Sequence, residues 1–149
     1  MVAKKLIDKL ACLKDIEQSI VEINEFLPEE RNFYVFQKDL KTRKAVERNI
    51  EIIGEAMDRL LKAYPDIDIT DSRKIVDTRN RIIHGYDSVS EDVIWLIVNR
   101  YLPILETEVK TLQKELEQEL WLSETTNPLQ VKTYSGFIIS YNLTCLAGR

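Results

Sequence analysis

Apolar residues recur at alternating steps of three and four positions from Leu6 to Leu27, and charged residues occupy the positions between them. This spacing places the apolar side chains on one face of an α-helix, because the helix turns once in about 3.6 residues. Pro28 follows directly, and a proline cannot continue a helix. The pattern predicts a long amphipathic first helix whose apolar face packs against another element. Its apolar positions are Leu6, Leu10, Leu13, Ile16, Ile20, Ile23 and Leu27.

A second helical pattern runs from Leu40 to Tyr64, where the sequence Tyr64-Pro65-Asp66 ends it. We expect this helix to be the antiparallel neighbour of the first. Gly54 lies inside it, although glycine costs a helix about 0.5–1 kcal/mol relative to alanine. A close contact with another helix would compensate for that cost, so we expect one at Gly54.

Two further helices are predicted after residue 65. Thr70 or Asp71 can cap a shorter helix that carries apolar residues at 75, 76, 82 and 83 and ends near Gly85. Ser90 can begin a long helix that continues to about residue 120, with acidic residues in its first turn. Pro103 removes one backbone donor inside this helix, so we expect a kink or break near residues 99–102.

These patterns predict an all-α fold, an up-and-down bundle of four to five helices. The chain has 149 residues, enough for one sizeable core, and only four glycines and four prolines. We assign residues 1–122 to the bundle. Residues 123–149 have a different composition, so we expect a C-terminal extension that is poorly ordered or packs on a partner.

The charge distribution limits the kinds of partner. A net charge of −4 argues against a protein that coats nucleic acid through its overall field, but basic residues gather at 38–48 and 73–81. Each cluster fits a solvated helix face, and together the two clusters also fit an enclosed anionic ligand. Cys12 and Cys145 lack the spacing of metal ligands, so we expect no metal and no cofactor.

The length of the apolar stretches and the composition of the first residues indicate in which cellular compartment the protein works. Spanning a bilayer takes about 20 apolar residues, and no stretch of this chain approaches that length. Charged residues interrupt the start of the chain before any apolar run of secretory length. We therefore expect a cytoplasmic protein that does not associate with membranes.

The segment from Arg79 to Tyr86 contains the only histidine, His84. Histidine exchanges protons near neutral pH because its unperturbed pKa is about 6.5, and arginine offers a charged fork that fits phosphate oxygens. If an RNA phosphate lies against Arg79, cleavage needs a base that takes the proton of the 2′-hydroxyl and an acid that protonates the leaving oxygen. One imidazole cannot easily face both oxygens. Two copies of His84 in a symmetric dimer could serve both. In this model Arg79 binds the phosphate and Asn80 orients the substrate or the imidazole by a hydrogen bond.

Structural roles remain open for the same residues. A histidine at a helix end often makes only structural hydrogen bonds, Tyr86 fits a half-buried anchor, and Arg79 could pair with Glu55 or Asp77. The alternative function is a non-catalytic helical module that binds a nucleotidyltransferase or a nucleotide through Arg79 and Tyr86.

The pattern Arg79-x4-His84-x-Tyr86 resembles the signature of the HEPN superfamily, specifically its HepT-like toxin family. Other segments between Leu6 and Leu120 resemble that family in the same order. They are Ala45-Val46-Glu47-Arg48, Ile53-Gly54-Glu55-Ala56, Val93-Ile94-Trp95 and Leu102-Pro103.

The resemblance implies a helical homodimer that acts as a metal-independent ribonuclease toxin, paired with a small nucleotidyltransferase antitoxin. It implies catalytic roles for Arg79 and His84 and a polar supporting role for Asn80. Tyr86 matches the tyrosine that the partner can adenylylate, which would place charge and bulk in the RNA site. Residues after 123 depart from the family pattern.

Overall fold

The computed structural model describes residues 2–28, 30–84 and 89–125, and this part of the chain contains helices and no strands. The predicted all-α bundle is therefore confirmed. Gly85, Tyr86 and residues 126–149 lie outside the described ranges, so the expectations for Tyr86 and for most of the C-terminal extension stay predictions. The elements are α1 (Val2–Phe26), α2 (Phe33–Lys38), α3 (Leu40–Ala63), α4 (Ser72–His84), α5 (Glu91–Leu96), the π-helix η1 (Ile97–Tyr101) and α6 (Leu102–Thr125).

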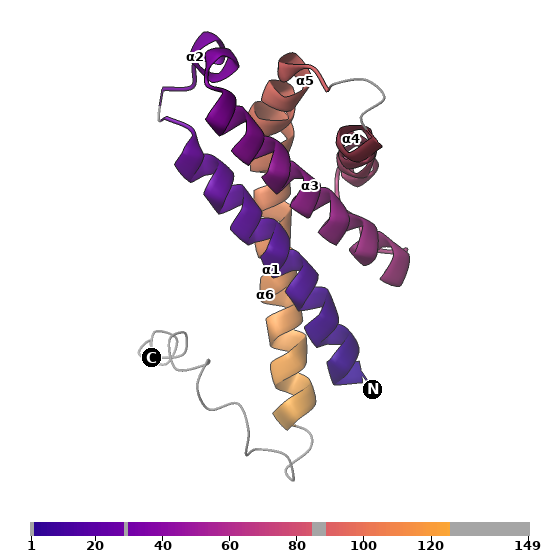
Figure 1. The fold of residues 1–149 in the computed structure, drawn as a ribbon. Coiled ribbons are helices and arrows are strands. Elements are labelled where there is room, and N and C mark those ends of the chain that lie inside the picture. Colours follow the sequence, from indigo (N-terminus) through magenta and orange to yellow (C-terminus); the bar gives the residue numbers. More distant parts are fainter. Residues whose placement is uncertain (1, 29, 85–88, 126–149) are drawn as a thin grey trace, which may run out of the picture.

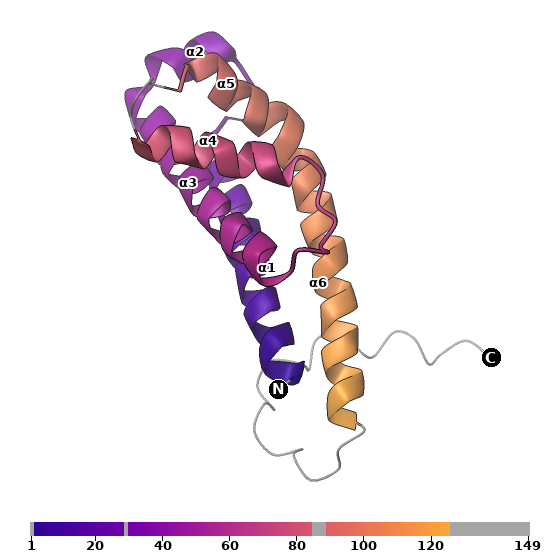
Figure 2. The same ribbon diagram turned by 90° about the vertical axis from the view of Figure 1, so that its right-hand side faces the viewer.

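The long helices α1, α3 and α6 form the body of the bundle. α1 and α3 run antiparallel and in contact, as the sequence predicted, and α6 packs on α1 (Figure 1). The shorter α4 packs on α3 and crosses it instead of following the long helices (Figure 2). The core is made of the apolar faces that the sequence pattern identified. Its fully buried side chains include Leu13, Ile16, Ile20, Ile23, Val46, Ile50, Ile53, Met57, Leu60, Ile94, Leu105 and Val109.

The short helix α2 was not predicted. The Asn32 side chain begins it by accepting hydrogen bonds from the backbone N–H groups of Tyr34 and Val35, as an N-cap residue does. Phe36 is buried, and its ring centroid lies 5.2 Å from that of Trp95 in α5. Six residues are too few to show a helical period, so the contact with α5 adds to the Asn32 cap in stabilising α2.

The irregularity expected near residues 99–102, a kink or a break, is present as a π-helix rather than as an interruption of the helix. In η1 the backbone N–H of Leu102 donates to the carbonyl of Ile97, five residues earlier, where an α-helix would use a spacing of four. The wider turn accommodates the missing N–H of Pro103 and its ring without ending the helix. One long helical column, α5–η1–α6, therefore runs from residue 91 to residue 125.

The start of α4 is tied to α6. The backbone N–H of Thr70 donates to the Glu108 carboxylate at 3.1 Å, and the Thr70 hydroxyl bonds the same carboxylate. Asp71 adopts a left-handed φ of 56°, and its carbonyl accepts from the N–H of Lys74 at 2.9 Å. These contacts fix where α4 begins.

No helix in the described residues is both long and apolar enough to cross a bilayer.

Candidate active site

Helices α3 and α4 approach each other closely at Gly54 and Arg79. A Cβ atom built on Gly54 would lie 2.3 Å from Arg79 Cβ and 2.8 Å from Arg79 Cγ, and 3.4 Å from the carbonyl oxygen of Ile75. Real Cβ atoms do not come this close, so only glycine allows this packing. The close helix contact expected at Gly54 is confirmed. Its partner is Arg79, the residue for which the sequence analysis predicted phosphate binding.

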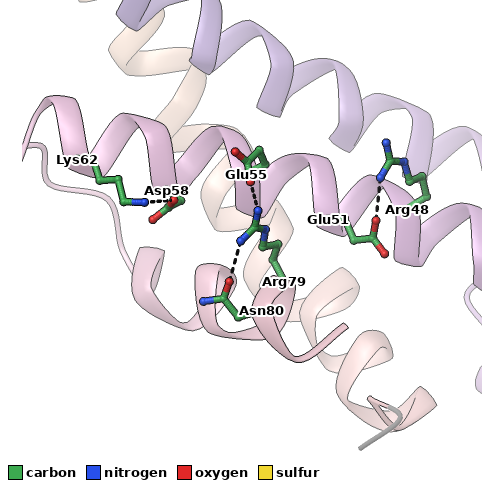
Figure 3. A network of polar contacts seen from close by, with 7 residues as sticks. All are labelled: Arg48, Glu51, Glu55, Asp58, Lys62, Arg79 and Asn80. Atoms are coloured by element: carbon green, nitrogen blue, oxygen red, sulfur yellow. Dashed lines mark hydrogen bonds and ion pairs between the residues drawn. The ribbon is translucent and has the colours of Figure 1, made fainter. Parts of the chain in front are cut away.

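The Arg79 guanidinium is held by one acceptor on each helix (Figure 3). Its Nη2 donates to Glu55 Oε2 of α3, and its Nη1 donates to Asn80 Oδ1 at 2.8 Å. Its Nε is buried and has no hydrogen-bond partner among the described residues. Of the two ion-pair partners that the sequence left open, the structure has Glu55 and not Asp77. The Arg79 side chain is nonetheless 23% exposed, so a ligand can reach it from solvent.

His84 is the last residue of α4 and is exposed. The helix is continuous from Arg79 to His84, so no break within it turns the imidazole towards Arg79. At about 100° per residue, the side chains of Arg79 and His84 lie about 140° apart around the α4 axis, and those of Asn80 and His84 about 40° apart. One chain therefore presents Asn80 and His84 on a common face, with Arg79 at its edge beside α3.

The basic clusters are partly neutralised. Carboxylates pair with Arg43, Lys44 and Arg48 in the first cluster and with Lys74 and Arg79 in the second. Lys44, Arg48 and Lys74 are 63–71% exposed, as expected for solvated helix faces, whereas the side chains of Arg43 and Arg79 are only 20% and 23% exposed. Arg73 and Arg81 of α4 are exposed, and Arg81 lies three residues before His84, on a neighbouring part of the helix surface. In the described part of the chain, no three His, Cys, Asp or Glu side chains are placed to hold a metal ion.

Comparison with known proteins places this site in a family. The family model described as "Ribonuclease HepT-like" matches residues 16–112, about two thirds of the chain, and the match includes all of α3 and α4. The chain belongs to the HepT-like ribonuclease family. The resemblance seen in the sequence motifs is thus confirmed.

Individual relatives carry ribonuclease names. The chain is 33% identical over 116 residues to "Putative RNase MJ0127" of Methanocaldococcus jannaschii, across 75% of this chain and 93% of that protein. It is 35% identical over 106 residues to "Probable ribonuclease HepT" of Thermococcus cleftensis, across 68% of this chain and 93% of that protein. It is 36% identical over 86 residues to "Putative RNase TTE0752" of Caldanaerobacter subterraneus, across 56% of this chain and 77% of that protein. No solved structure matches this HepT-like chain.

Two features of the HepT-like site were incompletely predicted from the sequence. Gly54 was expected to make a close helix contact, but the sequence did not show that Arg79 itself is in that contact. Glu55 was one of two possible partners of Arg79, and only the register of α4 on α3 distinguishes them. The catalytic roles of Arg79, Asn80 and His84 stay predictions.

Proposed function

We propose that this HepT-like protein is a metal-independent endoribonuclease whose active site is shared by two copies of the chain. The observation that supports this most directly is that Arg79 is both fixed in position and accessible to solvent. Its guanidinium is fixed at the α3–α4 contact, remains 23% exposed, and lies on the same helix as the exposed His84. A fixed, accessible guanidinium on the same helix as an exposed imidazole suits a substrate phosphodiester.

The proposed reaction begins with the ribose 2′-hydroxyl. One imidazole removes its proton, the 2′-oxygen attacks the adjacent phosphorus, and the bond to the 5′-oxygen breaks as a second imidazole protonates that oxygen. The products are a 2′,3′-cyclic phosphate and a free 5′-hydroxyl. Arg79 stabilises the additional negative charge on the phosphate oxygens. Imidazoles supply both proton transfers, so the scheme does not require a metal-bound water.

The geometry of α4 supports a site made by two chains. Each chain has one histidine, and helical geometry places it about 140° around the axis from Arg79. A twofold axis near the exposed end of α4 would bring a second His84 to the same phosphate, because an isologous interface presents the same patch from both subunits. We therefore link the activity to a homodimer.

We also propose that the protein is the toxin of a cytoplasmic toxin–antitoxin pair and that its antitoxin is a nucleotidyltransferase. In this scheme the Tyr86 phenol oxygen attacks the α-phosphorus of ATP and releases pyrophosphate, leaving an adenylyl group two residues from His84. The added phosphate would compete with RNA for Arg79. Intact-mass measurement after incubation with the partner and ATP tests this step, and a mass gain that persists in Tyr86→Phe contradicts it.

The nuclease proposal is tested by incubating purified wild-type and His84→Ala proteins with RNA in excess chelator. We expect wild type to cleave and His84→Ala to be slower by about 10²- to 10⁴-fold, with the same oligomeric state. A contaminating nuclease would degrade RNA equally in both samples.

Equal cleavage by the two proteins, or none by wild type, would favour the alternative of a non-catalytic module that binds a nucleotidyltransferase or a nucleotide. The net charge of −4 supports that alternative, because a chain of low overall basicity attracts RNA only weakly through its general field.

A further inference from the structure

Three of the carboxylates on one side of α3 make ion pairs of two different kinds (Figure 3). Glu51 pairs with Arg48, and Asp58 pairs with Lys62, in each case within α3 and across three or four residues. The cations of these two pairs are 71% and 76% exposed. Such pairs on a solvated helix surface restrict little else in the fold.

The pair between Glu55 and Arg79 is different. It joins two helices across 24 residues of sequence, and its cation is only 23% exposed. The Glu55 side chain is 46% exposed, so the pair sits at the surface with the arginine largely enclosed. Glu55 therefore contacts a side chain that is mostly shielded from solvent.

The base of the arginine is fixed by Gly54. The Cβ and Cγ atoms of Arg79 fill the space where a Gly54 side chain would be, so they are confined between the two helices. Glu55 is the next residue on α3, and its carboxylate accepts a hydrogen bond from the guanidinium at the other end of the same side chain. Gly54 and Glu55 thus act on the two ends of Arg79.

The hydrogen bonds leave a defined set of free donors. A guanidinium carries five N–H hydrogens. Glu55 takes one from Nη2, Asn80 takes one from Nη1, and the buried Nε has no partner among the described residues. Each terminal nitrogen keeps one N–H that does not bond Glu55 or Asn80, and these two N–H groups are the candidate donors for a phosphate. Their direction is set by the two protein acceptors.

We propose that Glu55 is a positioning residue for Arg79: its carboxylate holds the guanidinium in the orientation that presents these two donors to the substrate phosphate. The inference rests on the proposed ribonuclease activity. Fixing a charged group before the substrate arrives avoids reorganisation during the reaction, and a misplacement of about 1 Å can cost about 10²-fold in rate. Glu55 itself need not contact the RNA.

The kinetic test compares Glu55→Ala with Glu55→Gln. Alanine removes the acceptor, so we expect kcat for RNA cleavage to fall about 10- to 100-fold, while KM stays level or falls because a carboxylate that repels phosphate is gone. Glutamine keeps an oxygen that accepts the same N–H, so we expect kcat within about fivefold of wild type. Glu51→Ala and Asp58→Ala are the matched controls on α3 and should keep wild-type kcat. Wild-type kcat in Glu55→Ala, or a Gln variant as slow as Ala, would overturn the proposal.

A second measurement does not depend on cleavage. In an NMR spectrum of ¹⁵N-arginine protein, we expect a resolved Nε–H signal from Arg79 in wild type and in Glu55→Gln, and its loss or collapse to the solvent-exposed position in Glu55→Ala. Arg43, whose Nε is also buried without a partner in the described residues, is the internal control. An unchanged Arg79 signal in Glu55→Ala refutes positioning by Glu55. Loss of the signal in a protein whose wild type does not cleave RNA supports the positioning and rejects the ribonuclease instead.

Discussion

Arg79 fills the space that a side chain at Gly54 would need, since a Cβ on Gly54 would lie 2.3 Å from Arg79 Cβ. The Cβ of a helical residue cannot move aside like the end of a long side chain, so α3 and α4 would have to separate. We expect Gly54→Ala to destabilise the protein by about 1–3 kcal/mol through overpacking, which exceeds the gain of about 0.5–1 kcal/mol from the better helix former. Urea unfolding of wild type and variant measures the difference.

A double-mutant cycle assigns the effect to this contact. In an Arg79→Gly background both clashing carbons are absent, so Gly54→Ala should lose most of its penalty there. An equal penalty in the two backgrounds would place the clash elsewhere. The Arg79→Gly single variant, which keeps Gly54, is the reference for the double variant.

The long helices could be predicted from the sequence because their apolar periods extend over many turns, and Pro103 located the irregular turn because a missing N–H acts locally. The helix α2 could not be predicted, because its stability comes from the contact of Phe36 with Trp95, far along the chain. The partner of Arg79 was ambiguous for a related reason. Glu55 is on another helix and Asp77 is on the same one, and only the packing of α4 on α3 decides between them.

Arg81 is an exposed cation three residues before His84 on α4. If RNA approaches His84 along this surface, Arg81 neutralises a backbone phosphate without taking part in the chemistry. We expect Arg81→Ala to weaken binding of a single-stranded RNA and to reduce the slope of log K against log salt by about 0.7, the value for one phosphate contact on a single strand. The kcat at saturating RNA should stay the same.

The measurement is a salt titration of RNA binding, performed with His84→Ala protein so that the RNA stays intact. Lys114, an exposed cation on α6, is the control, and Lys114→Ala should leave the slope unchanged. Equal slopes for wild type and Arg81→Ala would exclude this part of α4 from the RNA contact.

Asp39 gives a pH dependence to the start of α3. Its carboxylate accepts from the Thr42 hydroxyl at 2.6 Å and from the Thr42 N–H at 3.2 Å. These hydrogen bonds lower the pKa of Asp39 below its ordinary value of 3.8, with the hydroxyl bond the largest cause. The folded state therefore favours the charged carboxylate, so its stabilising effect is present above pH 4 and is lost as the pH falls through the lowered pKa.

We expect the free energy of unfolding of wild type to exceed that of Asp39→Asn by an amount that is constant near neutral pH and shrinks as the pH falls below about 4. Asparagine also caps a helix but does not titrate, so the comparison isolates the charge. Urea unfolding between pH 7 and pH 2.5 measures the difference. A difference that stays constant over this range would show that Asp39 caps α3 without this linkage.

The shared site makes a distinct prediction for mixed dimers. If one phosphate needs an imidazole from each chain, a dimer of one wild-type and one His84→Ala subunit lacks either the base or the acid. Its kcat should then fall by about 10²- to 10⁴-fold, as in the dimer with both histidines replaced. Were each chain to carry a complete site of its own, the mixed dimer would keep about half of the wild-type rate, because one of its two equivalent sites would remain intact.

Co-expression with two different affinity tags and sequential purification yields the mixed species, and a mixed dimer made with Lys114→Ala controls for the tags. Retention of about half the activity, or cleavage by a monomer, would contradict the two-chain mechanism.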